Sequence, residues 1–148
     1  DEQVMIVPGT DGQKMSKSYG NVINVFADDQ TLKKQVMGIV SDSKTLEEPK
    51  DADNDNTFKL FKLVASADQV AVMHEHYLRG NYGYGHAKKE LLHAIMERWK
   101  DQRALFHALM TDKAELDRQL LIGAEKARAV ASTTLERVRE RVGYLPKR

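Results

Sequence analysis

The amino-acid sequence predicts a mainly α-helical protein, an antiparallel helical bundle preceded by a short strand and a flexible loop. Apolar residues recur at helical spacing over most of the 148 residues, and capping pairs precede several of these segments. Only one short run, residues 4–7, has the composition of a strand. The predicted helices are joined by few residues, which favours antiparallel neighbours in a bundle.

The composition fits one compact domain with an appended flexible segment. The 23 basic and 22 acidic side chains nearly cancel, so a protein that binds nucleic acid by bulk charge is excluded and any RNA contact must be local. Cysteine is absent, which excludes disulfides and thiolate metal sites and suits a reducing cytosol. The sequence has no signal peptide and no run of 18 apolar residues, so we expect a soluble, cytoplasmic protein without a membrane partner.

The predicted strand lies at the start of the chain. Residues 4–7 read Val-Met-Ile-Val and are followed by the turn dipeptide Pro8-Gly9. No second segment has a strand-like composition, and the chain opens on Asp1 rather than on methionine. We therefore expect the sheet to lie upstream and the chain to be a piece of a longer protein.

The predicted helices follow in order. The first begins after Asp28 or Asp29, either of which can cap it, and carries an apolar face from Leu32 to Val40. Residues 41–56 hold six acidic residues and predict a solvated connection, with a turn of helix begun by a capping box at residues 45–48. A third segment, residues 57–65, has a broad apolar face and predicts another helix.

Three further features organise the remainder of the chain. Ser66 and Gln69 form a capping box for a helix that stops at Gly80, and residues 80–85 predict a turn. One long helix should then run to about Met110, with Met96 and Trp99 in its buried stripe. Asp112 with Glu115 caps a last helix that ends at Gly143 and Pro146.

Residues 8–21 are rich in Gly, Ser, Thr, Asp and Lys and predict a mobile loop. Within it, Lys14 and Lys17 bracket Ser16, an arrangement that suits a polyphosphate because ammonium groups neutralise phosphoryl oxygens and hydroxyls donate hydrogen bonds. A mobile loop can also close only when the nucleotide is bound. The alternative is a solvated surface loop that binds no ligand.

Residues 14–18 read Lys-Met-Ser-Lys-Ser, the KMSKS signature of class I aminoacyl-tRNA synthetases, in the family's order of strand, turn, signature and helices. The chain resembles tryptophanyl-tRNA synthetases over nearly its whole length. The tyrosyl enzymes are the nearest alternative, but their signature usually departs from this pentapeptide. The matching stretches are Pro8-Gly9 with residues 14–21, which resemble the family's signature loop, residues 40–43, residues 77–80 with 84–88, and residues 123–131.

The resemblance implies a division of the chain and a reaction. Residues 1–24 would end the Rossmann catalytic domain with the KMSKS loop, and residues 25–148 would form the α-helical anticodon-binding domain. The whole enzyme would activate tryptophan with ATP and Mg²⁺, transfer it to tRNA(Trp), and act as a homodimer. The partner signature of the family, a His-Ile-Gly-His type segment, is absent from the chain, as is the amino-acid pocket, so we expect this chain alone to be inactive.

The resemblance also assigns roles to the signature residues. Lys14 and Lys17 would be the catalytic residues, which bind the ATP phosphates and the departing pyrophosphate as electrostatic catalysts. Ser16 and Ser18 would shape the loop and donate hydrogen bonds, and the backbone around Met15 would approach the adenine. All five residues would thus form the ATP-binding segment.

Candidate tRNA contacts lie at the turn after Gly80 and on the last helix. Tyr84, Lys88 and Lys89, with Tyr82 and His86 nearby, combine aromatic rings and cations that can stack a base and hold its phosphate. The alternative is that Tyr82 and Tyr84 pack the turn and the lysines are only solvated. On the last helix the candidates for phosphate contact are Arg137, Arg139 and Arg141, which can instead pair with Glu136 and Glu140.

The histidines and the acidic residues 53–56 do not predict a metal site, and one other class of function fits the sequence. His74 and His76 lie two residues apart and point to different sides of a helix, and residues 53–56 lack the glycine and glutamate of a calcium loop, so no metal site is predicted. The alternative function is a stand-alone helical RNA- or protein-binding module in which the lysine loop binds no nucleotide.

Overall fold

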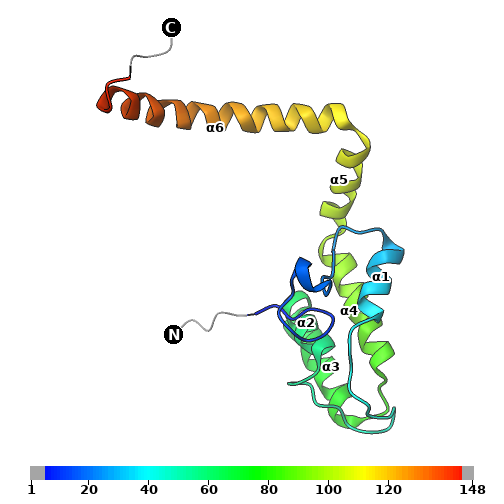
Figure 1. Ribbon diagram of the computed structural model, residues 1–148. Coiled ribbons are helices and arrows are strands. Elements are labelled where there is room, and N and C mark those ends of the chain that lie inside the picture. The colour runs from blue at the N-terminus through cyan, green and yellow to red at the C-terminus, as the bar shows by residue number, and fades with distance from the viewer. Residues whose placement is uncertain (1–5, 145–148) are drawn as a thin grey trace. The chain divides into compact units, whose positions relative to one another are not determined.

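The computed structural model describes residues 6–144, and these are mainly helical, as predicted (Figure 1). The chain divides into two compact units, Asp1–Arg103 and Ala104–Arg148, which are considered separately. The helices are η1 (a 3₁₀ helix, Lys17–Tyr19), α1 (Asp29–Met37), α2 (Asn56–Val64), α3 (Ala67–Arg79), α4 (Tyr84–Arg98), α5 (Lys100–Thr111) and α6 (Lys113–Arg141).

The predicted strand at residues 4–7 does not appear in its described part. Residues 4 and 5 lie outside the described residues, and Ile6 and Val7 have no regular secondary structure. The Met15 N–H donates to the Val7 carbonyl at 2.9 Å, and an isolated antiparallel bridge joins Pro8 to Lys14. A strand needs a partner along its length, and here the pairing ends in a turn after one bridge.

The predicted helix starts are confirmed because the capping side chains accept the hydrogen bonds expected of them. Asp28 caps α1 and accepts from the Thr31 N–H at 2.9 Å. Ser66 and Gln69 form both bonds of the capping box at the start of α3. Asp112 caps α6. These side chains satisfy backbone N–H groups that the first helical turn leaves without a partner.

The turn of helix predicted at residues 45–48 is not formed. The Thr45 N–H does donate to the Glu48 carboxylate, at 2.6 Å, which is half of the expected capping box. The carbonyls of Thr45, Leu46 and Glu48 instead accept from the ammonium of Lys50, at 2.9, 3.3 and 3.0 Å. Lys50 is only 3% exposed, so a buried cation takes the place of helical N–H donors.

The single long helix predicted up to Met110 is wrong, because the chain bends at Trp99 between α4 and α5. In the first turn of α5, Arg103 is buried, and its guanidinium donates to the Val25 carbonyl and to the Asp29 carboxylate. The sequence around Trp99 contains no glycine or proline that would mark the break. Trp99 and Met96 are half-buried against the core.

The core of the first unit lies between four helices. Helices α1 and α2 both pack on α4, and α3 packs on α2. Tyr77 is the largest fully buried side chain, and its ring contacts those of Phe58, Tyr82 and Tyr84. The buried apolar residues are Ile23, Leu32, Val36, Ile39, Ala52, Phe58, Leu60, Phe61, Met73, Tyr77, Tyr82, Ala87, Leu91, Ala94 and Ile95.

The second unit consists of the end of α5 and the 29-residue helix α6. No residue of α6 is buried, although Leu120, Leu135 and Val138 repeat at helical spacing and are 46–62% exposed. The predicted packing of helices is therefore seen among α1 to α4 but not for α6 within its own unit. Among the described residues, no helix is long and apolar enough to span a membrane.

We expect substitution of Asp55 by alanine to destabilise the first unit strongly. Its carboxylate caps α2 by accepting from the Phe58 N–H and also accepts from the Tyr77 hydroxyl, both at 2.8 Å. Asp55→Ala should lower the free energy of unfolding by about 2–4 kcal/mol, because it removes a cap and leaves a buried hydroxyl unpaired. Asp28→Ala removes an exposed cap and should cost about 1 kcal/mol. Equal losses for the two variants in urea unfolding would contradict this expectation.

The stability should also depend on the ionisation of Asp55. Burial raises the pKa of this carboxyl above its ordinary value. A raised pKa in the folded state means that folding favours the protonated form, so the contribution is present at low pH and is lost as pH rises through the folded pKa. The free energy of unfolding of the wild type relative to Asp55→Asn should therefore fall as pH rises from about 4. A difference that stays constant with pH would exclude this titration.

Candidate functional site

The signature loop is a set of hydrogen-bonded turns, a feature that its composition did not indicate. The Gly9 N–H donates to the Gln13 carbonyl at 2.7 Å, and the Gly12 N–H donates to the Gly9 carbonyl at 3.0 Å. Gly12 has φ +83°, a left-handed conformation that favours glycine. The loop from residue 8 to residue 21 therefore has a defined backbone path beside α2 (Figure 1).

Asn21 holds the centre of this loop, a role that the sequence did not indicate, since Asn21 is only the last residue of the segment that resembles the signature loop. Its side chain is buried, with 3% exposure. The amide nitrogen donates to the Asp11 carboxylate at 2.8 Å and to the Lys14 carbonyl at 3.1 Å, and the amide oxygen accepts from the Ser16 N–H at 2.8 Å. The available signal was a single asparagine directly after Gly20, at the end of the polar segment.

Asp11 completes this arrangement at the tip of the loop. Its carboxylate also accepts from the Gln13 N–H at 3.0 Å. The hydrogen bond from the Asn21 amide holds the pKa of Asp11 below its usual range. The side chain is therefore ionised at neutral pH and acts only as an acceptor.

Gly9 is the residue that leaves room for Asn21. A Cβ atom at position 9 would lie 2.4 Å from the side-chain amide of Asn21 and 2.8 Å from its carbonyl oxygen. Both distances are far inside van der Waals contact, so any larger residue would displace the amide. The glycine that the sequence places in the turn dipeptide is thus required by packing.

The five signature residues divide into anchors and exposed groups. Met15 is half-buried and packs against the core, and the Ser16 hydroxyl accepts from the Ser18 N–H at 3.3 Å, which caps η1. Lys14 and Lys17 are exposed, and among the described residues neither ammonium group has a hydrogen-bond or ion-pair partner. The two predicted catalytic cations therefore stand free on a loop whose backbone is anchored.

A groove of about 560 Å³ lies between this loop and α2. Two further cations line it. Lys62 lies over the Phe58 ring at 5.5 Å, and Lys59 donates to the Asn54 carbonyl at 3.2 Å. The other lining residues are Ile6, Pro8, Gly12 and Leu63.

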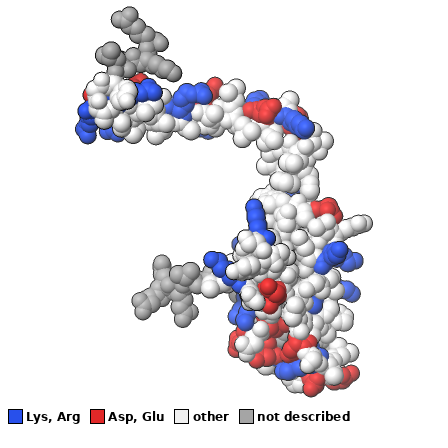
Figure 2. Space-filling view, viewed as in Figure 1, with Lys and Arg blue, Asp and Glu red and all other residues white. Residues whose placement is uncertain are grey.

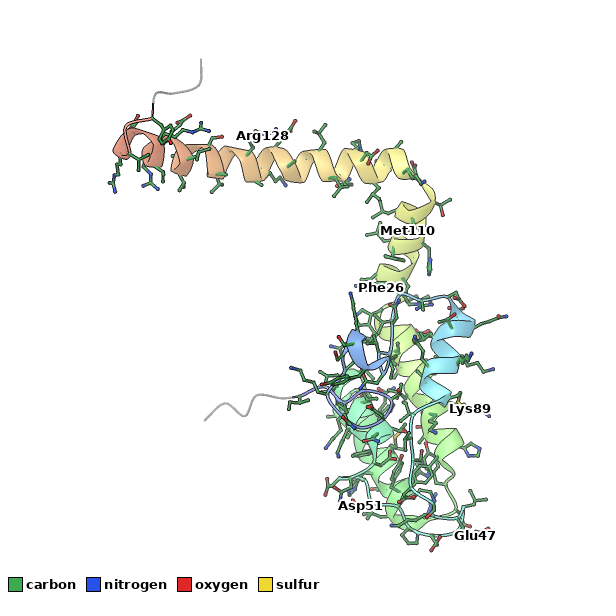
Figure 3. All side chains as sticks on the ribbon, in the orientation of Figure 1. Phe26, Glu47, Asp51, Lys89, Met110 and Arg128 are labelled. Atoms are coloured by element: carbon green, nitrogen blue, oxygen red, sulfur yellow. The ribbon has the colours of Figure 1, made fainter. Side chains whose placement is uncertain are left out.

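The predicted tRNA contacts on α4 have unequal surroundings. The Tyr84 hydroxyl donates to the Asp42 carboxylate at 2.5 Å, and the Lys88 ammonium donates to the Ile39 carbonyl at 2.6 Å. Both side chains therefore hold the connection between α1 and α2 against α4. Lys89 is exposed and has no hydrogen-bond partner among the described residues (Figure 3).

Tyr82 packs the turn, which is the alternative that the sequence left open. It is buried, and its ring stacks on His76 with centroids 5.0 Å apart and an interplanar angle of 20°. The His86 ring lies 6.0 Å from the Tyr82 ring. A base cannot stack on Tyr82 without displacing this packing.

Outside the signature loop, charged side chains gather at one end of the first unit and lie along α6. Acidic side chains gather at the end of the first unit that carries Glu47 and Asp51 (Figures 2 and 3). No group of three His, Cys, Asp or Glu residues in the described part of the chain has the geometry to hold a metal ion. On α6 the only ion pair between described residues joins Arg118 to Glu115, so the pairs that Glu136 and Glu140 could make are not formed.

The chain is similar in sequence to a known protein family and to individual members of it. The family model for class I tRNA synthetases (W and Y) matches residues 3–100. The chain is 46% identical over 140 residues to the tryptophan–tRNA ligase of Fusobacterium nucleatum, with 95% of this chain and 43% of that protein covered. It is 40% identical over 143 residues to the tryptophan–tRNA ligase of Campylobacter jejuni, with 97% and 45% covered.

The solved structures agree with the sequence comparison. The crystal structure of Campylobacter jejuni tryptophanyl-tRNA synthetase, complexed with ADP and tryptophan, superposes with a TM-score of 0.88 at 40% identity and covers 97% of this chain and 45% of that one. The chain thus spans less than half the length of the relatives that it matches. Since the family model matches well over half of its residues, the chain belongs to the class I tRNA synthetases of the tryptophan and tyrosine group.

Proposed function

We propose that this chain is part of a tryptophan–tRNA ligase and supplies its KMSKS loop and helical tRNA-binding domain. The observation that carries the proposal is a pair of exposed cations, Lys14 and Lys17, which have no partner in the described part of the chain and lie on an anchored loop with the family signature. The relatives named above are tryptophan ligases, which supports tryptophan rather than tyrosine as the amino acid. Residues 1–24 would close the catalytic domain, and residues 25–148 would face the tRNA.

The proposed reaction has two steps. A carboxylate oxygen of tryptophan attacks the α-phosphorus of ATP, and the bond from this phosphorus to the bridging oxygen breaks with its electron pair leaving on pyrophosphate. The terminal ribose hydroxyl of tRNA(Trp) then attacks the acyl carbon of the resulting tryptophanyl-adenylate, so that an ester forms, AMP leaves with the electron pair of the broken bond, and the hydroxyl proton is released. Mg²⁺ enters with ATP as part of the substrate and is held by phosphate oxygens.

The lysines would act on the charge that develops in the first step. Negative charge grows on the departing pyrophosphate, and an ammonium group placed beforehand stabilises it without reorganisation. The ammonium groups of Lys14 and Lys17 donate no hydrogen bond to other described residues, so their N–H groups are available to phosphate oxygens. They move no proton and therefore serve as electrostatic catalysts.

The other signature residues would prepare this placement. Met15 anchors the loop through its side chain and through its N–H, which donates to the Val7 carbonyl. The backbone around Met15 would approach the adenine, as the resemblance implies. Ser16 accepts from the Ser18 N–H and retains its hydroxyl hydrogen for a phosphate oxygen. The Ser18 hydroxyl is exposed and can donate in the same way. We place the ligase in the cytoplasm as a homodimer, as the resemblance implies.

A chimeric ligase tests the role of the lysines. Residues 1–148 would replace the aligned 45% of the Campylobacter jejuni ligase, and tryptophan-dependent ATP–pyrophosphate exchange would be measured. We expect the chimera to be active and Lys14→Ala or Lys17→Ala to lower kcat by about 10²-fold each, the usual cost of removing one stabilising donor. The 148-residue chain alone should show no exchange.

The matched control is Lys33→Ala, which removes an exposed cation of α1, outside the signature loop of residues 8–21. It should leave the exchange rate unchanged. An inactive chimera, or full exchange in both signature variants, would refute the proposal and favour the alternative of a helical binding module. Exchange that depends on tyrosine would reassign the amino acid.

A second test separates the candidate tRNA contacts on α4. Lys89→Glu should raise the KM for tRNA(Trp) in aminoacylation by about tenfold without altering exchange, because it reverses a phosphate contact worth roughly 1–2 kcal/mol. Lys88→Gln should instead lower the melting temperature, since its ammonium holds the Ile39 carbonyl. An unchanged KM for Lys89→Glu would remove this residue from the tRNA interface.

A further inference from the structure

We propose that Asn21, outside the signature pentapeptide, is the positioning residue that sets the places of both signature lysines. This inference rests on the proposed function, because it gives Asn21 its effect through Lys14 and Lys17. It concerns one buried amide and three hydrogen bonds, each to a different part of the loop.

The chemistry of the amide matches its surroundings in polarity. The nitrogen faces two acceptors, the Asp11 carboxylate and the Lys14 carbonyl, and the oxygen faces a donor, the Ser16 N–H. A carboxylate at position 21 would offer no hydrogen to Asp11 or to Lys14. An aliphatic side chain would take from the Lys14 carbonyl and the Ser16 N–H the bonds that Asn21 makes to them, and would leave Asp11 with the Gln13 N–H alone. Of side chains this size, only asparagine offers two donors and an acceptor together.

The bonds act on the backbone beside each lysine. One fixes the carbonyl of Lys14 itself. Another fixes the N–H of Ser16, the residue that caps η1 and so sets the direction of the helical turn that begins at Lys17. The planar amide of Asn21 thus holds the Lys14 carbonyl and the Ser16 N–H in fixed relative positions. We call this hydrogen-bonded arrangement of Asn21, Lys14 and Ser16, together with Asp11, the frame, and it carries both ammonium groups. Met15 lies between the two points and is half-buried.

The frame is also tied to the helical unit. The Asn21 carbonyl accepts from the Thr10 N–H at 2.9 Å, and the Thr10 carbonyl accepts from the Val40 N–H, just beyond α1, at 2.7 Å. Gly9 leaves the space in which the amide sits. These hydrogen bonds therefore fix the loop, and with it the backbone of both lysines, relative to the helices.

The first experiment examines the frame itself in the 148-residue chain. Carboxyl carbon shifts would be followed by NMR during a pH titration. In the wild type the pKa of Asp11 should lie below its ordinary value, since Asn21 donates to it, and Asn21→Ala should raise it toward that value. An Asp11 pKa that is the same in both proteins would overturn the inference.

The chain contains a matched control for this titration. Asn54 donates from its amide to the Asp51 carboxylate at 2.7 Å in the connection between α1 and α2, and this bond lowers the pKa of Asp51. Asn54→Ala should raise the pKa of Asp51 and leave Asp11 unchanged. It therefore removes the same kind of pair at a place without a proposed role in catalysis.

The second experiment measures exchange in the chimeric ligase. Asn21→Ala should lower kcat per active site and raise the KM for ATP, each by about tenfold or more, because misplaced catalytic groups lose much of their effect. The KM for tryptophan should not change. Loss of folded protein alone would lower the apparent kcat and leave the KM for ATP as it was. Asn54→Ala should match the wild type.

A conservative pair of substitutions tests the polarity of the frame. Asn21→Asp sets two carboxylates against each other and should impair exchange as much as Asn21→Ala. Addition of Asp11→Asn to this variant restores a donor and an acceptor between positions 11 and 21, though not the bond to Lys14, and should recover part of the lost kcat. No recovery in the double variant would argue against the frame.

The outcomes separate this inference from the proposed function. If Lys14→Ala and Lys17→Ala lose exchange while Asn21→Ala keeps wild-type kcat and KM for ATP, the positioning role is overturned and the proposed function stands. If the unmodified chimera is inactive, or the lysine variants keep full exchange, the proposed function fails and the positioning role fails with it. The Asp11 titration reports on the frame in either case.

Discussion

The hydrogen bond from the Tyr77 hydroxyl to the Asp55 carboxylate is the interaction on which the first unit depends. Tyr77 has no solvent exposure, so its hydroxyl must find a partner inside the protein. The partner is the residue that caps α2, and the Tyr77 carbonyl in turn accepts from the Lys50 N–H at 2.8 Å. One residue of α3 thereby fixes the start of α2 and the end of the connection that precedes it. Displacing Tyr77, Asp55 or Lys50 would leave a buried polar group without its hydrogen bond.

The signature loop follows the same rule on a smaller scale. Two of its backbone polar groups, the Lys14 carbonyl and the Ser16 N–H, bond to the buried amide of Asn21, and neither lysine side chain takes part in these bonds. Both lysines are exposed, with no ammonium partner among residues 6–144. A site that neutralises charge on a departing group needs this combination, because a cation already engaged inside the protein must break a bond before it can act.

The α4 surface shows how chemically similar residues take different roles. Lys88 and Lys89 are adjacent, yet Lys88 donates to the Ile39 carbonyl in the connection after α1 and Lys89 is exposed. Tyr84 similarly donates to Asp42 from across the connection between α1 and α2. A lysine beside an aromatic ring has the same appearance in the sequence whether it supports a loop or meets a phosphate. Which of these side chains is exposed to a binding partner thus depends on the groups that the fold engages.

The sequence alone determined the features that depend on neighbours three or four residues apart. Capping by Asp28, by Ser66 with Gln69, and by Asp112 was predictable because a cap and its N–H donor lie within one helical turn. The apolar spacing of the helices and the signature of residues 14–18 were readable for the same reason. The tertiary structure decided what depends on distant groups: the bend at Trp99 beside Arg103, whose bond to Val25 spans 78 residues, and the engagement of Lys88 with Ile39, 49 residues away. Even the seven residues from Asn21 to Lys14 exceed one helical turn. Such partners are set by packing of the whole unit, which no local pattern records.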